Sequence, residues 1–129
     1  MSEWYARPVL FVTDIGRSVE FYVGQLGFTQ SWSYEEAGKS LVVQVDRGGC
    51  ELILSSQWPD KVGTGLMFIS LDVAVLHALR AELEARHVQV KDGSWGYRLM
   101  VVGDLDGNEL YFPYPAESSA QPELSPVNL

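Results

Sequence analysis

The sequence predicts an α+β fold made of two similar halves within one domain. In each half an apolar strand candidate ends in an aspartate that opens an amphipathic helix, at residues 9–25 around Asp14 and at residues 67–86 around Asp72. The two aspartates are 58 positions apart, a period too long for a solenoid repeat and suited to two compact half-domains. Further strand candidates follow both helices, so we expect a duplicated strand–helix–strands unit.

The first half opens with a strand candidate at residues 9–12 and a helix at 15–25. Asp14 is placed to cap the start of this helix and Gly27 to end it. Apolar residues recur inside it at helical spacing, so one of its faces should lie on a sheet. Glycine and charged residues at 35–39 and 46–49 suit turns between three further strands. These strands are predicted at residues 31–34, 40–45 and 50–54.

The second half follows a loop at residues 56–65. Its strand and helix are predicted at 67–71 and 73–86, and two strands at 95–102 and 109–114 are joined by a turn at 104–108. Residues 88–92 read as a connection, although 88–90 are an alternative source of one more strand. The halves therefore span about 6–56 and 64–114 of one domain at 1–114. The composition of 115–129 predicts a disordered tail, because it has little apolar surface to offset the entropy of ordering.

Composition excludes several classes of partner. The 129 residues carry a net charge of −8, and the nine Lys and Arg residues are scattered, which argues against nucleic acid binding. No apolar run approaches the ~20 residues that a membrane span needs, and residues 1–7 lack a signal-peptide pattern, so we expect no membrane partner and a cytoplasmic location. The single cysteine, Cys50, excludes an intrachain disulfide and a multi-cysteine zinc site.

Four short motifs occur in a characteristic order: DIGRSVEFY at residues 14–22, LGF at 26–28, WGY at 95–97 and DLDGN at 104–108. On these motifs the chain resembles the vicinal oxygen chelate superfamily, in its glyoxalase and bleomycin-resistance branch, over roughly residues 7–114. The resemblance implies two paired βαβββ modules whose curved mixed sheets form a partly open cavity, with the helices on the outer face.

Metal-using members of this superfamily carry His, Gln or Glu at four strand positions. The resemblance places these positions at Arg7, Ile53, Leu66 and Tyr111, and none of these side chains is a good ligand for a divalent cation. A two-residue slip would bring Glu51 to the position of Ile53, since both face the same side of a strand, and this choice stays open. We therefore predict no metal and no other cofactor.

Aromatic side chains are abundant around the predicted cavity. Strand alternation places Phe11 and Phe68 on the inward face, together with Tyr111 and Glu109. Stacking on such rings contributes ~0.5–1.5 kcal/mol per pair beyond burial, and rings also attract cations. Arg7 and Glu109 are the candidate polar contacts. The full set of candidate ligand-binding residues is Arg7, Phe11, Trp32, Tyr34, Ile53, Trp58, Leu66, Phe68, Trp95, Tyr97, Glu109 and Tyr111.

The resemblance to the bleomycin-resistance branch implies a homodimer that sequesters an antibiotic without turnover. We accordingly predict a metal-free small-molecule binding protein for a planar or cationic organic ligand, and assign no catalytic residues. The alternative is an enzyme of the same fold, a glyoxalase-like lyase, an isomerase or a dioxygenase, which either uses a metal at displaced ligands such as Glu51 and Glu109 or needs none. A third interpretation is a subunit whose aromatic patches contact another protein. The sequence leaves open the ligand, any turnover, the oligomeric state and whether the modules pair within or between chains.

Overall fold

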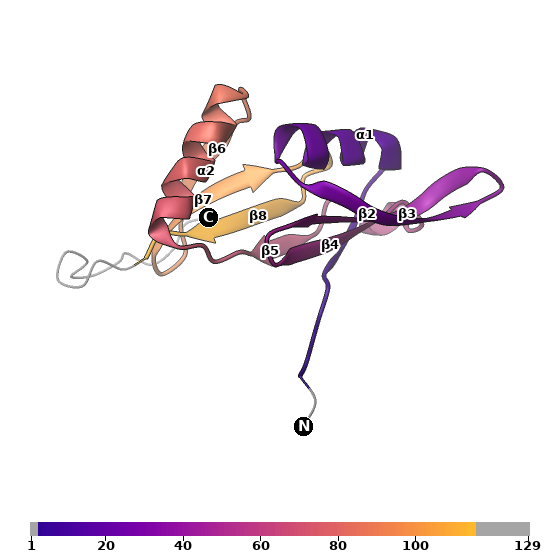
Figure 1. Cartoon of the computed structure of the whole chain (residues 1–129), viewed down its shortest axis with the longest axis horizontal. Helices are drawn as coiled ribbons and strands as arrows, with labels where there is room; N and C mark the ends of the chain where they lie inside the picture. The colour runs from indigo at the N-terminus through magenta and orange to yellow at the C-terminus, as the bar shows by residue number, and fades with distance from the viewer. Residues whose placement is uncertain (1–2, 116–129) are drawn as a thin grey trace. The chain divides into compact units, whose positions relative to one another are not determined.

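The computed structural model describes residues 3–115, which divide into two compact units (Figure 1). The first unit comprises the chain up to Gly65 together with Asp104–Asn108, and the second comprises Leu66–Gly103 and the residues from Glu109 onward. Each unit contains a four-stranded mixed sheet and a helix that follows its first strand. The predicted α+β class with two βαβββ modules is therefore confirmed.

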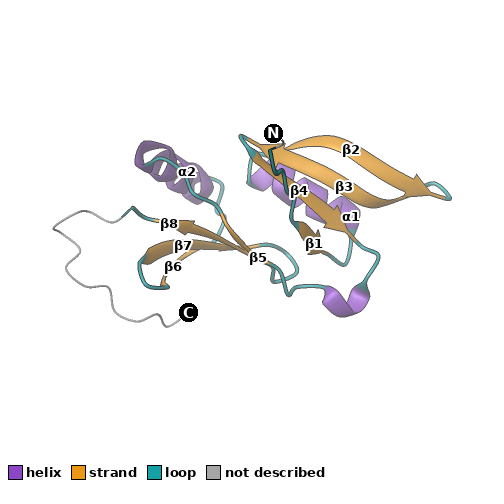
Figure 2. Ribbon diagram, turned by 90° about the horizontal axis from the view of Figure 1, so that it is seen from below, coloured by secondary structure: helices purple, strands orange, loops and turns teal. Residues whose placement is uncertain are grey.

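The sheet of the first unit has the strand order β1-β4-β3-β2, in which β1 runs parallel to β4 and the other neighbours are antiparallel. Helix α1 contacts β3 and β4 on one face of this sheet, as Figure 2 shows. The elements of the unit are β1 (Val9–Phe11), α1 (Ile15–Glu20), the π-helical turn η1 (Phe21–Gln25), β2 (Thr29–Glu36), β3 (Lys39–Arg47), β4 (Cys50–Ser55) and the short 3-10 helix η2 (Pro59–Lys61).

Helix α1 begins as the sequence predicts, because the Asp14 carboxylate accepts a hydrogen bond from the Arg17 backbone N–H at 3.1 Å. The helical segment ends at Gln25 as predicted, but its second part is π-helical: the chain widens after Glu20 into η1, where Leu26 N–H donates to the Phe21 carbonyl at 3.1 Å. A π-helical turn shifts the side-chain direction relative to a regular helix. Here it contains Tyr22, whose ring is fully buried.

The hairpin of β2 and β3 is tighter than predicted. Its turn consists of Ala37 and Gly38, both with positive φ (51° and 77°), as a two-residue hairpin loop requires. The residues predicted as a longer turn at 35–39 therefore extend the two strands instead. Every residue of β2 is exposed, and the long hairpin is visible in Figure 2.

The second unit has the strand order β5-β8-β7-β6, again with one parallel pair, β5 and β8. Helix α2 buries Leu76, Leu79 and Leu83, and it contacts β6. Among residues 3–115, no helix is long and apolar enough to cross a membrane. The elements are β5 (Leu66–Phe68), α2 (Val73–Ala85), β6 (Val90–Ser94), β7 (Arg98–Gly103) and β8 (Glu109–Pro113).

Three predictions for the second unit were wrong at their boundaries. Residues 88–92 were expected to connect, with 88–90 as the alternative source of a strand, and β6 begins at Val90 and supplies the strand that the pattern lacked. The strand expected at 95–102 begins only at Arg98, because residues 95–97 turn around Gly96 (φ 78°) and Trp95 N–H donates to the Tyr97 carbonyl at 2.9 Å. Strand β5 is also shorter than the expected 67–71. The predicted tail after residue 115 lies outside the described residues.

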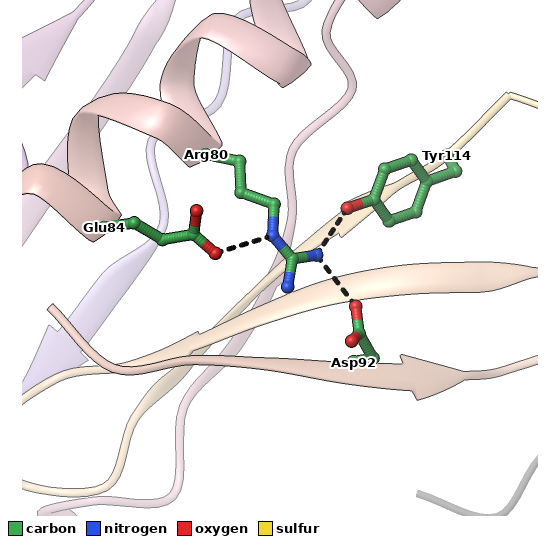
Figure 3. A network of polar contacts seen from close by, with 4 residues as sticks. All are labelled: Arg80, Glu84, Asp92 and Tyr114. Atoms are coloured by element: carbon green, nitrogen blue, oxygen red, sulfur yellow. Dashed lines mark hydrogen bonds and ion pairs between the residues drawn. The ribbon is translucent and has the colours of Figure 1, made fainter.

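Arg80 ties α2 to the edge of the second sheet (Figure 3). Its guanidinium donates to Asp92 on β6 at 2.8 Å, to the Tyr114 hydroxyl at 2.7 Å and to Glu84 one helical turn on at 3.2 Å. The hydrogen bond from Arg80 lowers the pKa of the Asp92 carboxyl. The network places Asp92, and its cross-strand partner Met100, on the side of the sheet that faces α2.

The turn between β7 and β8 is organised by Asp104 and packs in the first unit. One carboxylate oxygen of Asp104 accepts the backbone N–H groups of Asp106 and Asn108 at 2.8 and 2.9 Å. The other accepts the Tyr22 hydroxyl and the Asn108 side-chain amide, both at 2.9 Å. Burial and the Asp104 carboxylate raise the pKa of Tyr22, which therefore remains a protonated donor.

The same turn is bonded to β1 and to the loop before β5. The Asp106 carboxylate accepts the hydroxyl and the backbone N–H of Thr13 at 2.7 and 3.2 Å. The Asn108 side chain accepts Gly65 N–H at 2.7 Å and donates to the Phe11 carbonyl at 3.1 Å. The fully buried amide of Asn108 thus pairs with the Gly65 N–H and with the Phe11 carbonyl, which also accepts Gly63 N–H at 3.4 Å.

Candidate functional site

The face of the second sheet turned away from α2 carries an aromatic cluster, formed by Phe68, Trp95, Tyr97 and Tyr111. The Phe68 ring lies 5.5 Å from Trp95, 6.0 Å from Tyr97 and 6.5 Å from Tyr111, and Trp95 lies 5.9 Å from Tyr111 (ring centroids). Most of these contacts are edge-to-face, the arrangement that ring quadrupoles favour. The second unit thus brings together four of the candidate ligand-binding residues.

Strand register explains how the cluster forms. Phe68 on β5 stands opposite Tyr111 on β8, and Tyr111 stands opposite Val101 on β7, so the three side chains share one face. Val101 and Leu99 are buried together with Tyr111. Trp95 and Tyr97 reach the cluster from the turn that precedes β7, and not from a strand as predicted.

The cluster is partly open to solvent. Phe68, Trp95 and Tyr97 retain 41%, 47% and 40% of their surface exposed, whereas Tyr111 is buried. Solvent-exposed rings over a buried apolar base provide contact area for a flat molecule. Leu66, which stands opposite Glu109 across β5 and β8, adds exposed apolar surface beside them.

Glu109 supplies a negative charge at the cluster. Its carboxylate accepts the Tyr111 hydroxyl at 3.2 Å. Burial of the ring and the nearby Glu109 carboxylate raise the pKa of Tyr111, so the phenol is neutral at neutral pH. The aromatic faces and the carboxylate both attract cations.

The first unit places other candidates around Gln44, on the sheet face opposite the buried Val43 and Val45. The Gln44 side-chain oxygen accepts Arg7 Nη1 and Trp32 Nε1, each at 2.7 Å. Its amide nitrogen donates to Asp46 at 2.9 Å and to Glu51 at 3.2 Å. All donors and acceptors of this buried amide are therefore satisfied.

Gln44 was not among the candidates from the sequence. The signal was present, because a polar residue between two buried valines must face the other side of the strand from them. Arg7 and Trp32 are thus both hydrogen-bonded to Gln44, a residue that the sequence analysis did not select. The Arg7 guanidinium, which was expected to contact a ligand, donates to Gln44.

The remaining candidates of the first unit form no side-chain hydrogen bond with Gln44. Phe11 packs edge-on against Trp58, with centroids 5.8 Å apart. Tyr34 donates to the exposed Glu36 at 2.8 Å on β2. Ile53 is half-buried and stands between Val9 on β1 and Gln44 on β3, its two cross-strand partners.

The four positions at which the resemblance places metal ligands carry side chains that are poorly suited to hold a divalent cation. The guanidinium at Arg7 donates to Gln44, while Ile53 and Leu66 are hydrocarbon and Tyr111 is a neutral phenol. Glu51, the alternative to Ile53, accepts from the Gln44 amide. Across residues 3–115, no three His, Cys, Asp or Glu side chains gather in a way that could hold an ion.

Comparison with known proteins gives a family and a fold. The model of the Glyoxalase/Bleomycin resistance protein/Dioxygenase superfamily matches residues 4–112. No curated protein sequence matches significantly.

Three similar solved structures illustrate the fold. TnmS3, an antibiotic binding protein from Streptomyces sp. CB03234, is 24% identical (TM-score 0.69; 90% of this chain and 99% of that chain covered). The bleomycin-binding protein from Streptomyces verticillus, complexed with copper(II)-bleomycin, is also 24% identical (TM-score 0.69; 90% and 100%). Lactoylglutathione lyase from Agrobacterium tumefaciens is 18% identical (TM-score 0.66; 88% and 95%). The two βαβββ units and the family match together confirm the predicted resemblance, and the chain belongs to the glyoxalase/bleomycin resistance protein/dioxygenase superfamily.

Proposed function

We propose that this protein binds a planar organic small molecule, with a preference for cations, on the aromatic cluster of its second unit and without chemical turnover. The observation that carries the proposal is the cluster itself, in which three partly exposed rings surround a buried base and a carboxylate stands at the edge. A flat ligand that stacks on these rings gains ~0.5–1.5 kcal/mol per ring beyond area burial.

Charge supports the preference for cations. Glu109 is next to the cluster, and the whole chain carries a net charge of −8 at neutral pH. A ligand that carries both a flat ring system and a positive group would use ring stacking, cation–π attraction and the carboxylate together.

The comparisons favour binding over catalysis for this chain. Two similar structures are described as antibiotic-binding and bleomycin-binding proteins, and the side chains at the usual metal positions are unsuited to a metal-dependent reaction. We therefore propose sequestration of an antibiotic-like molecule as the biological role. Because lactoylglutathione lyase shares the same fold, turnover has to be tested directly.

The ligand test uses 1-naphthylmethylammonium as a planar cation and a panel of planar antibiotics, titrated into the full chain. Binding is followed through the four Trp indole N–H signals in NMR, each assigned by its Trp→Phe variant. Trp95→Ala should weaken binding of the cation by about 1–2 kcal/mol, or roughly fivefold to thirtyfold. Glu109→Gln should weaken it severalfold through loss of the negative charge.

Trp58→Ala is the matched control for the cation, because Trp58 is half exposed, packs against Phe11 in the first unit and lies outside the cluster. Equal losses of cation binding in the Trp58 and Trp95 variants would show non-specific contact with tryptophan, and the proposal would be abandoned. The same result would follow if no member of the panel gave saturable binding. Stoichiometric metal in the purified protein, together with a turnover that chelation abolishes, would replace the proposal with an enzymatic function.

We also propose that the protein is a homodimer. Trp4 and Tyr5 precede β1 and are 98% and 65% exposed in the single chain, an unfavourable exposure for large apolar side chains that contact with a second copy would relieve. Light scattering on the purified chain should give twice the 14.4 kDa chain mass. A monomer mass at micromolar concentration would contradict this part of the proposal.

A further inference from the structure

The first unit holds a second pair of aromatic rings, with a lysine placed over them. Phe11 at the end of β1 packs edge-on against Trp58 (82° between ring planes). The ammonium nitrogen of Lys61 lies 5.6 Å from the centre of the Phe11 ring and 5.1 Å from that of Trp58. These three residues form what we name the lysine-capped pair.

Local backbone structure holds the lysine in this place. Pro59 opens η2, and Lys61 N–H donates to the Trp58 carbonyl at 3.0 Å, so the residues at positions 58 and 61 lie close together in one tight turn. The Thr64 hydroxyl then donates to the Lys61 carbonyl at 2.9 Å and fixes the exit of the turn. Because the turn fixes the Lys61 backbone beside Trp58, the side chain needs only its own length to bring the ammonium over both rings.

The first unit repeats the Phe–Trp contact of the second unit, but the charged side chain beside the rings is positive in the first unit and negative in the second. Phe11 stands opposite Ser55 on β4, just as Phe68 stands opposite Tyr111 on β8. Both phenylalanines occupy the last residue of the first strand of their sheet, and each contacts a tryptophan from a turn or loop. The residue that accompanies the rings is Glu109 in the second unit and Lys61 in the first.

The charge on Lys61 is available to a ligand. Among residues 3–115, no carboxylate forms an ion pair with Lys61, and the contacts of its ammonium group are those with the two rings. Trp58 is half exposed, so a flat molecule can stack on it beside the ammonium. A cationic ligand is repelled there, whereas a carboxylate or sulfonate attached to the flat ring can pair with Nζ.

We propose that the lysine-capped pair is a binding site for aromatic anions, such as aryl carboxylates, and that it is separate from the cation-preferring aromatic cluster of the second unit. The net charge of −8 repels anions at long range, so selectivity for an anion at this place has to come from the local contact with Lys61. This inference does not rest on the proposed function, because it concerns other residues and the opposite ligand charge.

The test titrates the full chain with 1-naphthoate, with the neutral analogue 1-naphthamide and with 1-naphthylmethylammonium. The assigned indole N–H signal of Trp58 reports on this site, and that of Trp95 reports on the second unit. Naphthoate should shift the Trp58 signal and bind about tenfold more tightly than naphthamide, and Lys61→Gln should remove this preference. Lys61→Arg should keep it within about twofold, because the charge is retained.

Lys39→Gln is the matched control, since it removes the same charge from an exposed lysine at the start of β3, and it should leave naphthoate affinity unchanged. Circular dichroism on each variant verifies that the fold is intact. The proposal fails if naphthoate leaves the Trp58 signal in place, if naphthamide binds equally well, or if Lys39→Gln and Lys61→Gln have equal effects. The proposed function fails on a separate observation, the response of Trp95 to the cationic probe.

Discussion

Replacing Tyr22 with phenylalanine tests the hydrogen-bond network around Asp104. The Tyr22 side chain is fully buried and its hydroxyl donates to the Asp104 carboxylate at 2.9 Å. Hydrogen bonds to an ionised group contribute about 1.5–3 kcal/mol, and phenylalanine fills the same space otherwise, so Tyr22→Phe should lower the free energy of unfolding by about that amount. The three other donors to Asp104 are retained, which keeps the loss within this range.

The assay is urea unfolding, followed by circular dichroism and repeated across pH. Because burial and Asp104 raise the pKa of Tyr22 above its ordinary value of 10.0, the stabilising effect is present below pH ~10 and is lost as pH rises further, when the unfolded chain ionises first. The variant should lack this part of the alkaline decline. Tyr34→Phe is the control, since its hydrogen bond to Glu36 is exposed and should be worth less than ~0.5 kcal/mol. Equal stability of Tyr22→Phe and the parent protein, or an unchanged alkaline decline, would refute the reasoning.

Three further substitutions test the packing and charge of the two units by the same unfolding measurement. Leu99→Ala leaves a cavity at a fully buried position and should lower the free energy of unfolding by about 2–5 kcal/mol. A decrease below ~1 kcal/mol would contradict the packing described. Gly63→Ala places a Cβ against the Asp106 carbonyl oxygen at a φ of 79°, so it should lower the free energy of unfolding by more than ~1 kcal/mol, which a neutral result would disprove. Asp92→Asn should cost less than ~1 kcal/mol because the ion pair with Arg80 is largely exposed. Since Arg80 lowers the pKa of Asp92, that contribution should be present above pH ~4 and lost as pH falls, and an unchanged acid profile in the variant would exclude it.

The duplicated strand–aspartate–helix pattern predicted two like halves, and the resemblance to the superfamily supplied the complete βαβββ unit. The Asp14 side chain forms the predicted cap, whereas the Asp72 side chain makes no hydrogen bond to its helix. An aspartate therefore precedes both helices, but only Asp14 caps its helix through the side chain. Strand β6 could not be predicted with the same ease because VKDGS is polar and lacks alternation. It is a strand because β7 pairs with it and Arg80 holds Asp92.

The candidate site was predictable as a list of residues and not as an arrangement. Alternation in β5 and β8 correctly places Phe68 and Tyr111 on one face. The position of Trp95 depends on a turn at Gly96, which the aromatic, strand-like composition of that segment concealed. Lys61 has no strand pattern to place it, and only the 3-10 turn after Trp58 shows that its charge lies over two rings.

The turn of residues 104–108 has a consequence for dividing the gene. Although it is encoded within the second half, its side chains complete the hydrogen bonding of Thr13, Tyr22, Phe11 and Gly65. A truncated product ending at residue 65 would lose these partners, and an insertion in the DLDGN segment would damage the half that lies upstream. Co-expressed fragments that divide the chain at residue 65 should therefore depend on each other to accumulate in a folded form.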